Sequence, residues 1–424
     1  GSLLQKLNML NKRSLGIVIL LGVVTFYALG TGFDFFFRLL YALLLVLGIG
    51  FGWAWLNLRG LEVRLTRTAN RGQVGGYLEG QVQVINRFRL PKSWLEVAEV
   101  SDLPDYTTGR GVALVRDQRR TWKTQTYLAR RGVYRTGQIE VTSHDPFGMF
   151  RLRRRFLPPQ EYTVLPAPQP LPDLDPRLAH LPSESRAHRR ANHITPNFSS
   201  VREYAVGDSF RHIHWPYTAK MNTLMVKDFD EGMSAEAWLV LDLQRSVQAG
   251  SDAVDNTEEL GVTIAASLIQ RLVDLSMPVG LAASGESAHL IRPDSSPAQL
   301  GNLMEALAQA QARGRTAMER FIYELRPQFS QFNTVTVVTP STRPEWVSAL
   351  ASLRRQGVKV AAVLVDPQDF GRVDSQESVL NALMLNQIPT YRVRRGQVLN
   401  DALRNALEGA VGTFVPAQGI EVGR

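Results

Sequence analysis

Two long uncharged segments near the N-terminus constrain this chain more than any other feature of its sequence. Residues 14–33 and 39–58 each comprise 20 residues without a formal charge, and five residues, 34–38, join them. A helix of that length, at ~1.5 Å per residue, can cross the apolar core of a bilayer. The pattern predicts a transmembrane α-hairpin. The remaining chain is long enough for further domains.

Basic side chains flank the hairpin and predict its orientation. Lys6, Lys12 and Arg13 precede it, Arg59 and Arg64 follow it, and the joining segment carries one charge of each sign. Segments on the cytoplasmic side of a membrane carry the excess of Lys and Arg. We therefore expect a two-pass protein of the inner (plasma) membrane, in contact with the lipid bilayer, with its N- and C-termini in the cytoplasm.

The region after the hairpin is basic and alternates apolar with polar residues. Residues 60–165 contain 18 Lys and Arg against 10 Asp and Glu, and turn residues interrupt the alternation at short intervals. This pattern predicts a β-sandwich. Its basic face suits anionic lipid head groups. Because aromatic platforms for bases are not evident among its arginines, we expect no nucleic-acid partner, although a nucleic-acid-binding membrane protein is kept as a second alternative.

Composition and proline content limit the other possibilities. The 424 residues include no cysteine, which excludes disulfides, cysteine-ligated zinc and thiol catalysis. Eight prolines between residues 157 and 182 predict an extended connector. The predicted divisions are an N-terminal tail and hairpin (1–59), a β-sandwich (60–165), a Pro-rich linker and polar segment (166–200), a charged segment (201–233) and an α/β domain (234–424).

The charged segment contains many ionised and aromatic side chains, and their order in the sequence follows no amphipathic period. Buried charge is tolerated only when it is paired, so one interpretation is a structural wedge in which Trp215 covers paired charges. The other interpretation is a docking site. The candidate signature or interaction residues are Arg202, Tyr204, Gly207, Asp208, Arg211, Trp215, Lys220 and Phe229.

A second set of residues in the same segment suggests a different chemistry. His212 and His214 are two residues apart, which places both imidazoles on one face of a strand, as paired metal ligands require. Together with Asp208 and Glu231 they could form a metal site. A metal-dependent hydrolase that uses these four residues is therefore the alternative function.

The segment resembles a known family. Its signature residues, together with the upstream run Asp145-Pro146-Phe147-Gly148-Met149-Phe150, are similar to the bacterial and archaeal domain-of-unknown-function family number 58. The resemblance implies a membrane-anchored protein with a von Willebrand factor type A-like C-terminal domain. It also implies a MoxR-type AAA+ ATPase as partner, and often a transglutaminase-like membrane protein. It implies no settled reaction.

We therefore expect an interaction or scaffold protein rather than an enzyme. It would act with the ATPase in the assembly or activation of other proteins, through domains that face the cytoplasm. This expectation rests mainly on the resemblance, whereas the residue patterns by themselves support the architecture.

The C-terminal region alternates apolar strands with amphipathic helices, which predicts a doubly wound α/β domain with its ligand site at the carboxyl ends of the strands. The first such end contains Asp242, Gln244 and Ser246. A von Willebrand type A domain binds Mg²⁺ with Asp-x-Ser-x-Ser and a later Asp. Here Gln244 replaces the first Ser, and the strand 334–339 ends without that Asp. We expect a degenerate metal site and no cofactor; the sequence disfavours Mg²⁺ without excluding it.

Overall fold

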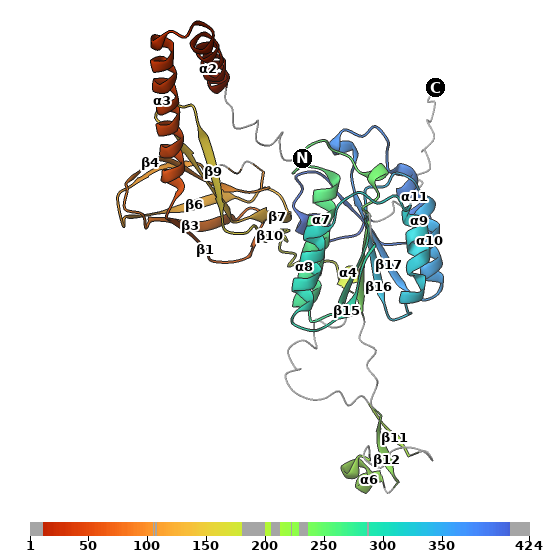
Figure 1. The fold of residues 1–424 in the computed structure, drawn as a ribbon. Coiled ribbons are helices and arrows are strands. Elements are labelled where there is room, and N and C mark those ends of the chain that lie inside the picture. The colour runs from red at the N-terminus through yellow and green to blue at the C-terminus, as the bar shows by residue number, and fades with distance from the viewer. Residues whose placement is uncertain are drawn as a thin grey trace, which may run out of the picture. The chain divides into compact units, whose positions relative to one another are not determined.

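The computed structural model describes residues 12–104, 106, 108–179, 200–204, 213–221, 223–228, 236–285 and 288–407. These residues divide into two compact units, Gly1–Leu165 and Pro166–Arg424. The structure is a mixture of helices and several β-sheets, with an apolar helix near the N-terminus (Figure 1).

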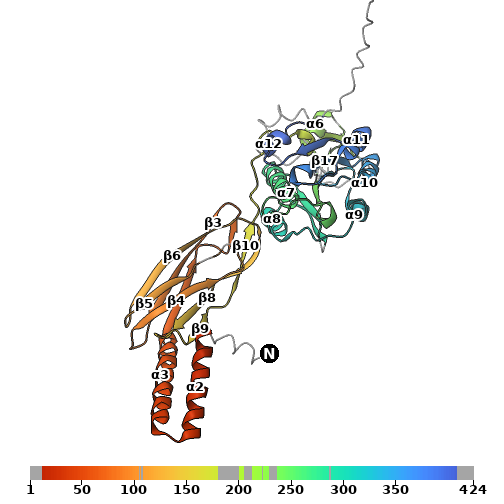
Figure 2. The ribbon, with the colours of Figure 1, turned by 90° about the horizontal axis from the view of Figure 1, so that it is seen from above.

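The first unit begins with two helices that pack side by side (Figure 2). They are α2 (Lys12–Thr31) and α3 (Asp34–Leu58), and the buried Ala28 lies on the side of α2 that packs. The predicted joint is misplaced, because Asp34–Arg38 form the start of α3 and only Gly32 and Phe33 connect the helices. An acidic residue at a helix N-terminus is favourable for the helix dipole, which explains why Asp34 begins α3.

One of these helices meets the length and composition of a membrane span. Among the residues that the structure describes, α3 is the helix that is long and apolar enough, with a mean hydropathy of 2.1. The apolar part of α2, Gly16–Thr31, is shorter.

The rest of the first unit is made of strands. They are β1 (Leu61–Arg67), β2 (Arg71–Gln73), β3 (Tyr77–Asn86), β4 (Lys92–Val100), β5 (Arg110–Leu114), β6 (Arg119–Tyr127), β7 (Gly132–Thr136), β8 (Gln138–His144), β9 (Arg151–Phe156) and β10 (Gln160–Leu165). Three sheets have the orders β1-β3-β6, β5-β4-β8-β9 and β2-β10-β7. Val63 and Val84 from the first sheet share one core with Leu95 and Ile139 from the second. The two larger sheets therefore bury their apolar faces together.

The C-terminal end of α3 is attached to this β domain through its own backbone carbonyls. Arg154 Nη1 donates to the carbonyl of Leu58 at 3.2 Å, and Lys92 Nζ donates to the carbonyl of Leu56. Asn57 Nδ2 donates to the carbonyl of Ser93 at 3.1 Å. The last carbonyls of a helix have no partner within it, so the bond from Arg154 satisfies the carbonyl of Leu58. The carbonyl of Leu56 also accepts from the N–H of Arg59 at 3.2 Å. Burial lowers the pKa of Lys92 to about 8.

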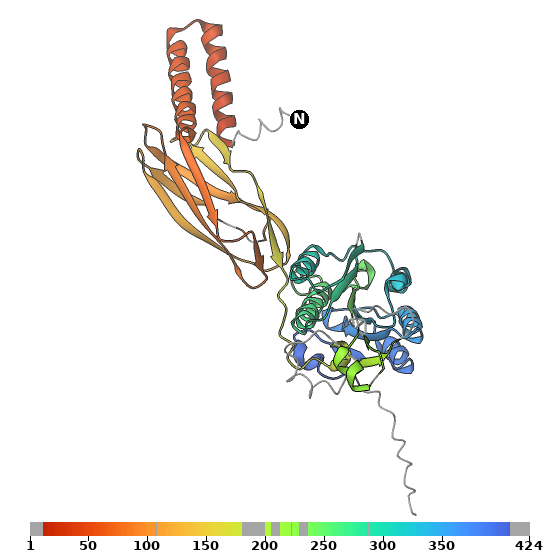
Figure 3. The same cartoon turned by 90° about the horizontal axis from the view of Figure 1, so that it is seen from below.

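The second unit contains the α/β domain (Figure 3). Its elements are α4 (Pro176–Ala179), β11 (Ser200–Glu203), α6 (Trp215–Met221), β12 (Met225–Asp228), β13 (Ala237–Leu241), η2 (Arg245–Val247), α7 (Thr257–Asp274), β14 (Val279–Ser284), β15 (Ala288–Asp294), α8 (Gln299–Gln309), α9 (Met318–Leu325), η3 (Arg326–Gln328), β16 (Thr334–Thr339), α10 (Glu345–Arg355), β17 (Lys359–Val365), η4 (Gln368–Phe370), α11 (Glu377–Leu385), β18 (Thr390–Val393) and α12 (Leu399–Ala402).

A six-stranded sheet forms the centre of this domain, in the order β15-β14-β13-β16-β17-β18. The pairs among β14, β13, β16, β17 and β18 are parallel, and β15 pairs antiparallel with β14 at the edge. Helices α7 and α8 cover one face, and α9, α10 and α11 cover the other (Figure 1). Asn256 caps α7 by accepting a hydrogen bond from the backbone N–H of Glu259 at 2.8 Å.

The first part of the proline-rich segment packs on the α/β domain. The backbone N–H of Gln169 donates to Ser267 Oγ on α7 at 2.8 Å. The N–H of Asp175 donates to the carbonyl of Leu403, and Asp175 Oδ2 accepts from the N–H of Ala406. Residues 166–179 therefore belong to the second unit, and residues 180–199 lie outside the described part.

Candidate binding site at the carboxyl ends of the sheet

Much of the predicted charged segment cannot be placed. Gly207, Asp208, Arg211, His212, Phe229 and Glu231 lie outside the residues that the structure describes. Of the four residues of the predicted hydrolase site, the structure therefore describes only His214. The wedge, docking and hydrolase interpretations of this segment all stay predictions.

The described part of the segment forms a small two-stranded sheet, β11-β12, with the helix α6. His214 Nδ1 accepts a hydrogen bond from the N–H of Tyr217 at 3.1 Å, and this bond stabilises the first turn of α6. Lys220 Nζ lies 6.0 Å from the centre of the Tyr217 ring. Trp215 is 64% exposed among the described residues, and the charged residues that it was expected to cover lie largely outside them, so that expectation stays a prediction.

A better defined site lies where the parallel strands of the α/β domain end. Asp242, one residue beyond β13, is buried. Its Oδ2 accepts a hydrogen bond from Thr339 Oγ1 at 2.6 Å, and its Oδ1 accepts from the N–H of Gln244 at 3.0 Å. Ser284 Oγ lies 3.5 Å from Oδ1. Burial raises the pKa of Asp242 to about 6, although these hydrogen bonds oppose the rise.

The degenerate metal site expected at Asp242 stays a prediction. Mg²⁺ requires several hard oxygen ligands in near-octahedral positions. Both carboxylate oxygens of Asp242 already accept hydrogen bonds, and Gln244 Nε2 donates to Ser246 Oγ at 2.7 Å. Two residues beyond β16 lies Ser341, whose N–H donates to Thr339 Oγ1 at 3.0 Å. Within the described ranges, no group of three His, Asp or Glu residues is placed to bind a metal.

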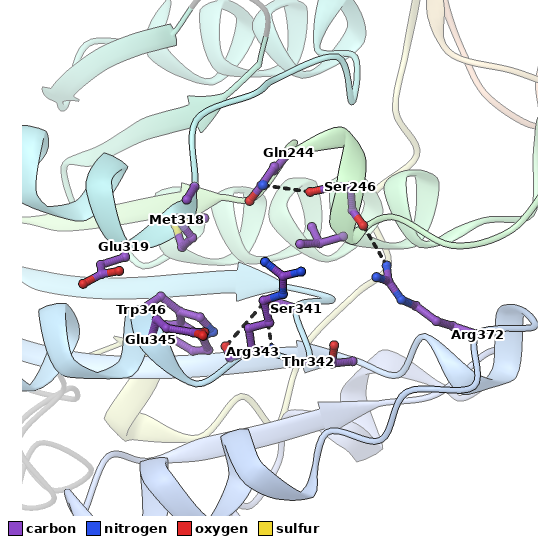
Figure 4. Close-up of a pocket in the computed structure, with 12 residues that line it drawn as sticks. Gln244, Ser246, Met318, Glu319, Ser341, Thr342, Arg343, Glu345, Trp346 and Arg372 are labelled. Atoms are coloured by element: carbon purple, nitrogen blue, oxygen red, sulfur yellow. Dashed lines mark hydrogen bonds between the residues drawn. The ribbon is translucent and has the colours of Figure 1, made fainter.

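A cavity of about 220 Å³ opens beside Gln244 and Ser246. Its lining is formed by Gln244, Ser246, Val247, Ala317, Met318, Glu319, Ser341, Thr342, Arg343, Glu345, Trp346 and Arg372. Figure 4 shows the guanidinium of Arg343 in the middle of this cavity, directed toward Gln244 and Ser246. Arg372 closes one side, because its Nη1 donates to the carbonyl of Ser246 at 2.9 Å.

Sequence reasoning found Asp242, Gln244 and Ser246 but missed the residues that meet them in space. Thr339 is the last residue of β16, and Arg343 lies on the loop that follows it. Their positions in the sequence could have identified them, since parallel strands end at one edge of a sheet and the loops that follow these strands converge there.

The fold and this site together define a class of protein: an α/β domain with a polar cavity at the carboxyl ends of its parallel strands. Residues 200–373 match the model of a family described as "Protein of unknown function DUF58". This match confirms the family resemblance predicted from the charged segment.

Comparison with individual proteins adds little about function. The chain is 24% identical over 202 residues to the "Uncharacterized protein YeaD" of Bacillus subtilis (strain 168), a match that covers 47% of this chain. It covers 48% of the relative, so the chain spans about half of that protein's length.

Solved structures also match parts of the chain. The C-terminal domain of wzt matches 25% of this chain and 73% of its own, with 13% identity and a TM-score of 0.20. The sporulation control protein Spo0M of Bacillus subtilis matches 25% of this chain and 50% of its own, with 8% identity and a TM-score of 0.17. Similarity at these TM-scores supports no conclusion about fold or function.

Proposed function

We propose that this chain is a membrane-anchored interaction protein whose folded domains face the cytoplasm. In this proposal α2 and α3 both cross the membrane, and the β domain is a β-sandwich just beneath the bilayer. The α/β domain is von Willebrand factor type A-like, for which the strand order β15-β14-β13-β16-β17-β18 is the structural support.

The observation that supports anchoring most strongly is the exposure of α3. Its buried residues are Gly50, Ala54, Asn57 and Leu58, all toward its C-terminal end, where it meets the β domain. Earlier in the helix large apolar side chains are exposed, and Leu45 is 65% exposed. Transfer of apolar surface out of water stabilises by about 25 cal/mol per Å². A lipid environment removes this exposed apolar surface from water.

The proposed partner follows from the family resemblance. It is a MoxR-type AAA+ ATPase, with a transglutaminase-like membrane protein as a further candidate, and the joint task is the assembly or activation of other proteins. The cavity at the carboxyl ends of the sheet supports the idea that the α/β domain recognises a partner, since ligand sites of open α/β sheets lie at this edge.

Co-purification tests the proposed function. The detergent-solubilised full chain is immobilised and incubated with the MoxR-type ATPase from the same genome, with ATP, with ADP and without nucleotide. We expect specific retention of the ATPase in at least one of these states. No retention in any of them would refute this partnership.

The alternatives predict different results. Stoichiometric zinc or manganese that is lost on His212→Ala would support the hydrolase. Retention of the full chain on DNA at physiological ionic strength, with a steep salt dependence, would support nucleic-acid binding.

A further inference from the structure

We infer that the cavity beside Gln244 and Ser246 is a metal-independent site for a carboxylate, with Arg343 as the cation that binds it. The inference rests on the proposed role of the α/β domain in binding proteins. It specifies the chemistry that the partner presents, namely an Asp or Glu side chain or a C-terminal carboxylate.

Arg343 is available to a ligand. Arg343 is exposed, its guanidinium forms no ion pair or hydrogen bond with the described residues, and it lies in the middle of the cavity (Figure 4). An arginine fork can bind a carboxylate through two parallel hydrogen bonds, which are stronger than bonds between neutral groups. A carboxylate placed in this cavity would therefore find its charge partner in Arg343.

The loop that carries Arg343 is held by a chain of hydrogen bonds. The N–H of Arg343 donates to Ser341 Oγ at 3.3 Å, and the N–H of Ser341 donates to Thr339 Oγ1 at 3.0 Å. Thr339 Oγ1 in turn donates to Asp242 at 2.6 Å. The buried Asp242 therefore holds the loop that positions a cation, rather than binding one itself.

The surroundings of Arg343 add further donors. Helices α9 and α10 begin at Met318 and Glu345, which both line the cavity, and helix N-termini favour negative charge. Ser246 and Thr342 contribute hydroxyl groups to the lining.

The opposite side of the cavity limits which anions fit. Glu319 and Glu345 lie on the other side of Arg343 from Arg372, and the side chains of Met318 and Trp346 lie close to them (Figure 4). Two carboxylates on the wall repel a ligand with several negative charges, such as a phosphate. A single carboxylate attached to a neutral or apolar segment meets less of this repulsion than a multiply charged anion, which favours a protein segment as the ligand.

Three labelled peptides test the inference on the full chain in detergent, by fluorescence polarisation in EDTA. One peptide of Gly and Ser contains a central Glu and an amidated C-terminus. The second contains Gln and a free C-terminal carboxylate, and the third contains Gln and an amidated C-terminus. We expect the first or the second to bind and the third not to bind, which also identifies the source of the carboxylate.

Two matched variants locate the binding. Arg343→Gln should weaken binding about tenfold, the loss expected for a hydrogen bond to a charged group. Arg355→Gln, at the exposed far end of α10, should leave it unchanged. The inference is overturned if no binding depends on a carboxylate, if Arg343→Gln binds like the wild type, or if binding requires Mg²⁺. Equal retention of the ATPase by wild type and Arg343→Gln would overturn this inference and leave the proposed function standing.

Discussion

Asp242 is a carboxyl group that the fold buries without an opposite charge. Burial raises its pKa from 3.8 to about 6, so the folded protein binds a proton between these pH values that the unfolded chain releases. Stability therefore falls as pH rises from about 4 to about 6. The raised pKa lowers the free energy of unfolding at neutral pH by about 3 kcal/mol, since each pKa unit corresponds to ~1.4 kcal/mol.

The substitution Asp242→Asn tests this account at the residue scale. Asparagine cannot ionise, so the variant should gain stability relative to the wild type as pH rises from about 4 to about 7. Urea unfolding of both proteins in EDTA at the two pH values measures the gain. If the stability difference between the proteins is the same at both pH values, folding does not raise the pKa of Asp242.

Glu99 is a buried carboxylate in a dense network of the β domain. It pairs with Arg67, accepts a hydrogen bond from Tyr106, and accepts from the N–H of Gly137 at 2.6 Å. Both members of the ion pair are nearly inaccessible to solvent.

Removal of Glu99 should therefore be costly. Glu99→Ala leaves the charge of Arg67 without its partner, so we expect the first unit to lose about 3 to 5 kcal/mol of unfolding free energy. Glu62→Ala is the control, because Glu62 pairs with Arg64 and Arg87 at the surface, and it should change stability little. Thermal unfolding followed by circular dichroism compares the two. Equal melting temperatures for both variants would show that the Glu99 network contributes no more than a surface pair.

The site was only partly predictable from the sequence. Asp242, Gln244 and Ser246 stand in one short run at the end of a predicted strand, so that position and the resemblance to Asp-x-Ser-x-Ser identified them. Thr339 is separated from Asp242 by 97 positions, and only the parallel pairing of β13 with β16 brings the two together. Arg343 had no local signal because its role depends on a cavity that four separate segments of the chain form.

At the scale of elements, sequence periodicity predicted the regular parts well. Strands β16 and β18 and helix α10 begin and end where the alternation of apolar segments placed them. Helix α9 was not predicted, because it is only eight residues long and Ala317 provides no capping side chain. Strand β15 was also missed, since Pro293 argues against a strand and is tolerated here at the edge of the sheet.

Trp94, close to α3, is an exposed residue with an unusual backbone conformation. It is 84% exposed and has a φ of 55°, which a bulky residue rarely adopts. It lines one cavity with Trp53 of α3 and with His144. If α3 spans the bilayer, Trp94 lies at the interface, where tryptophan is enriched in membrane proteins.

Quenching by brominated lipids tests this position. Trp94→Ala should reduce the fraction of tryptophan emission that bromolipids quench in vesicles, because the removed side chain contacts the head-group region. Trp122→Phe, within the β domain, should not lower this fraction, because it removes an emitter that the bromolipids do not reach. A quenched fraction that Trp94→Ala does not lower would place Trp94 in water.

At the scale of the whole molecule, the attachment of α3 to the β domain matters most. Two side chains of the β domain, Lys92 and Arg154, donate to carbonyls in the last turn of α3. Asn57 of α3 donates in turn to the carbonyl of Ser93. A helix attached in this way has no flexible linker to the β domain, so the position of the helix determines the position of that domain.

The orientation of the hairpin is the central claim, and reporter fusions in a bacterial host measure it most directly. A reporter that is active only outside the cytoplasm is inserted between Gly32 and Phe33, or fused after Arg424. The account predicts an active fusion in the loop and a silent fusion at the C-terminus. A strong signal from the C-terminal fusion, or silence from both when both proteins are stably expressed, would contradict it.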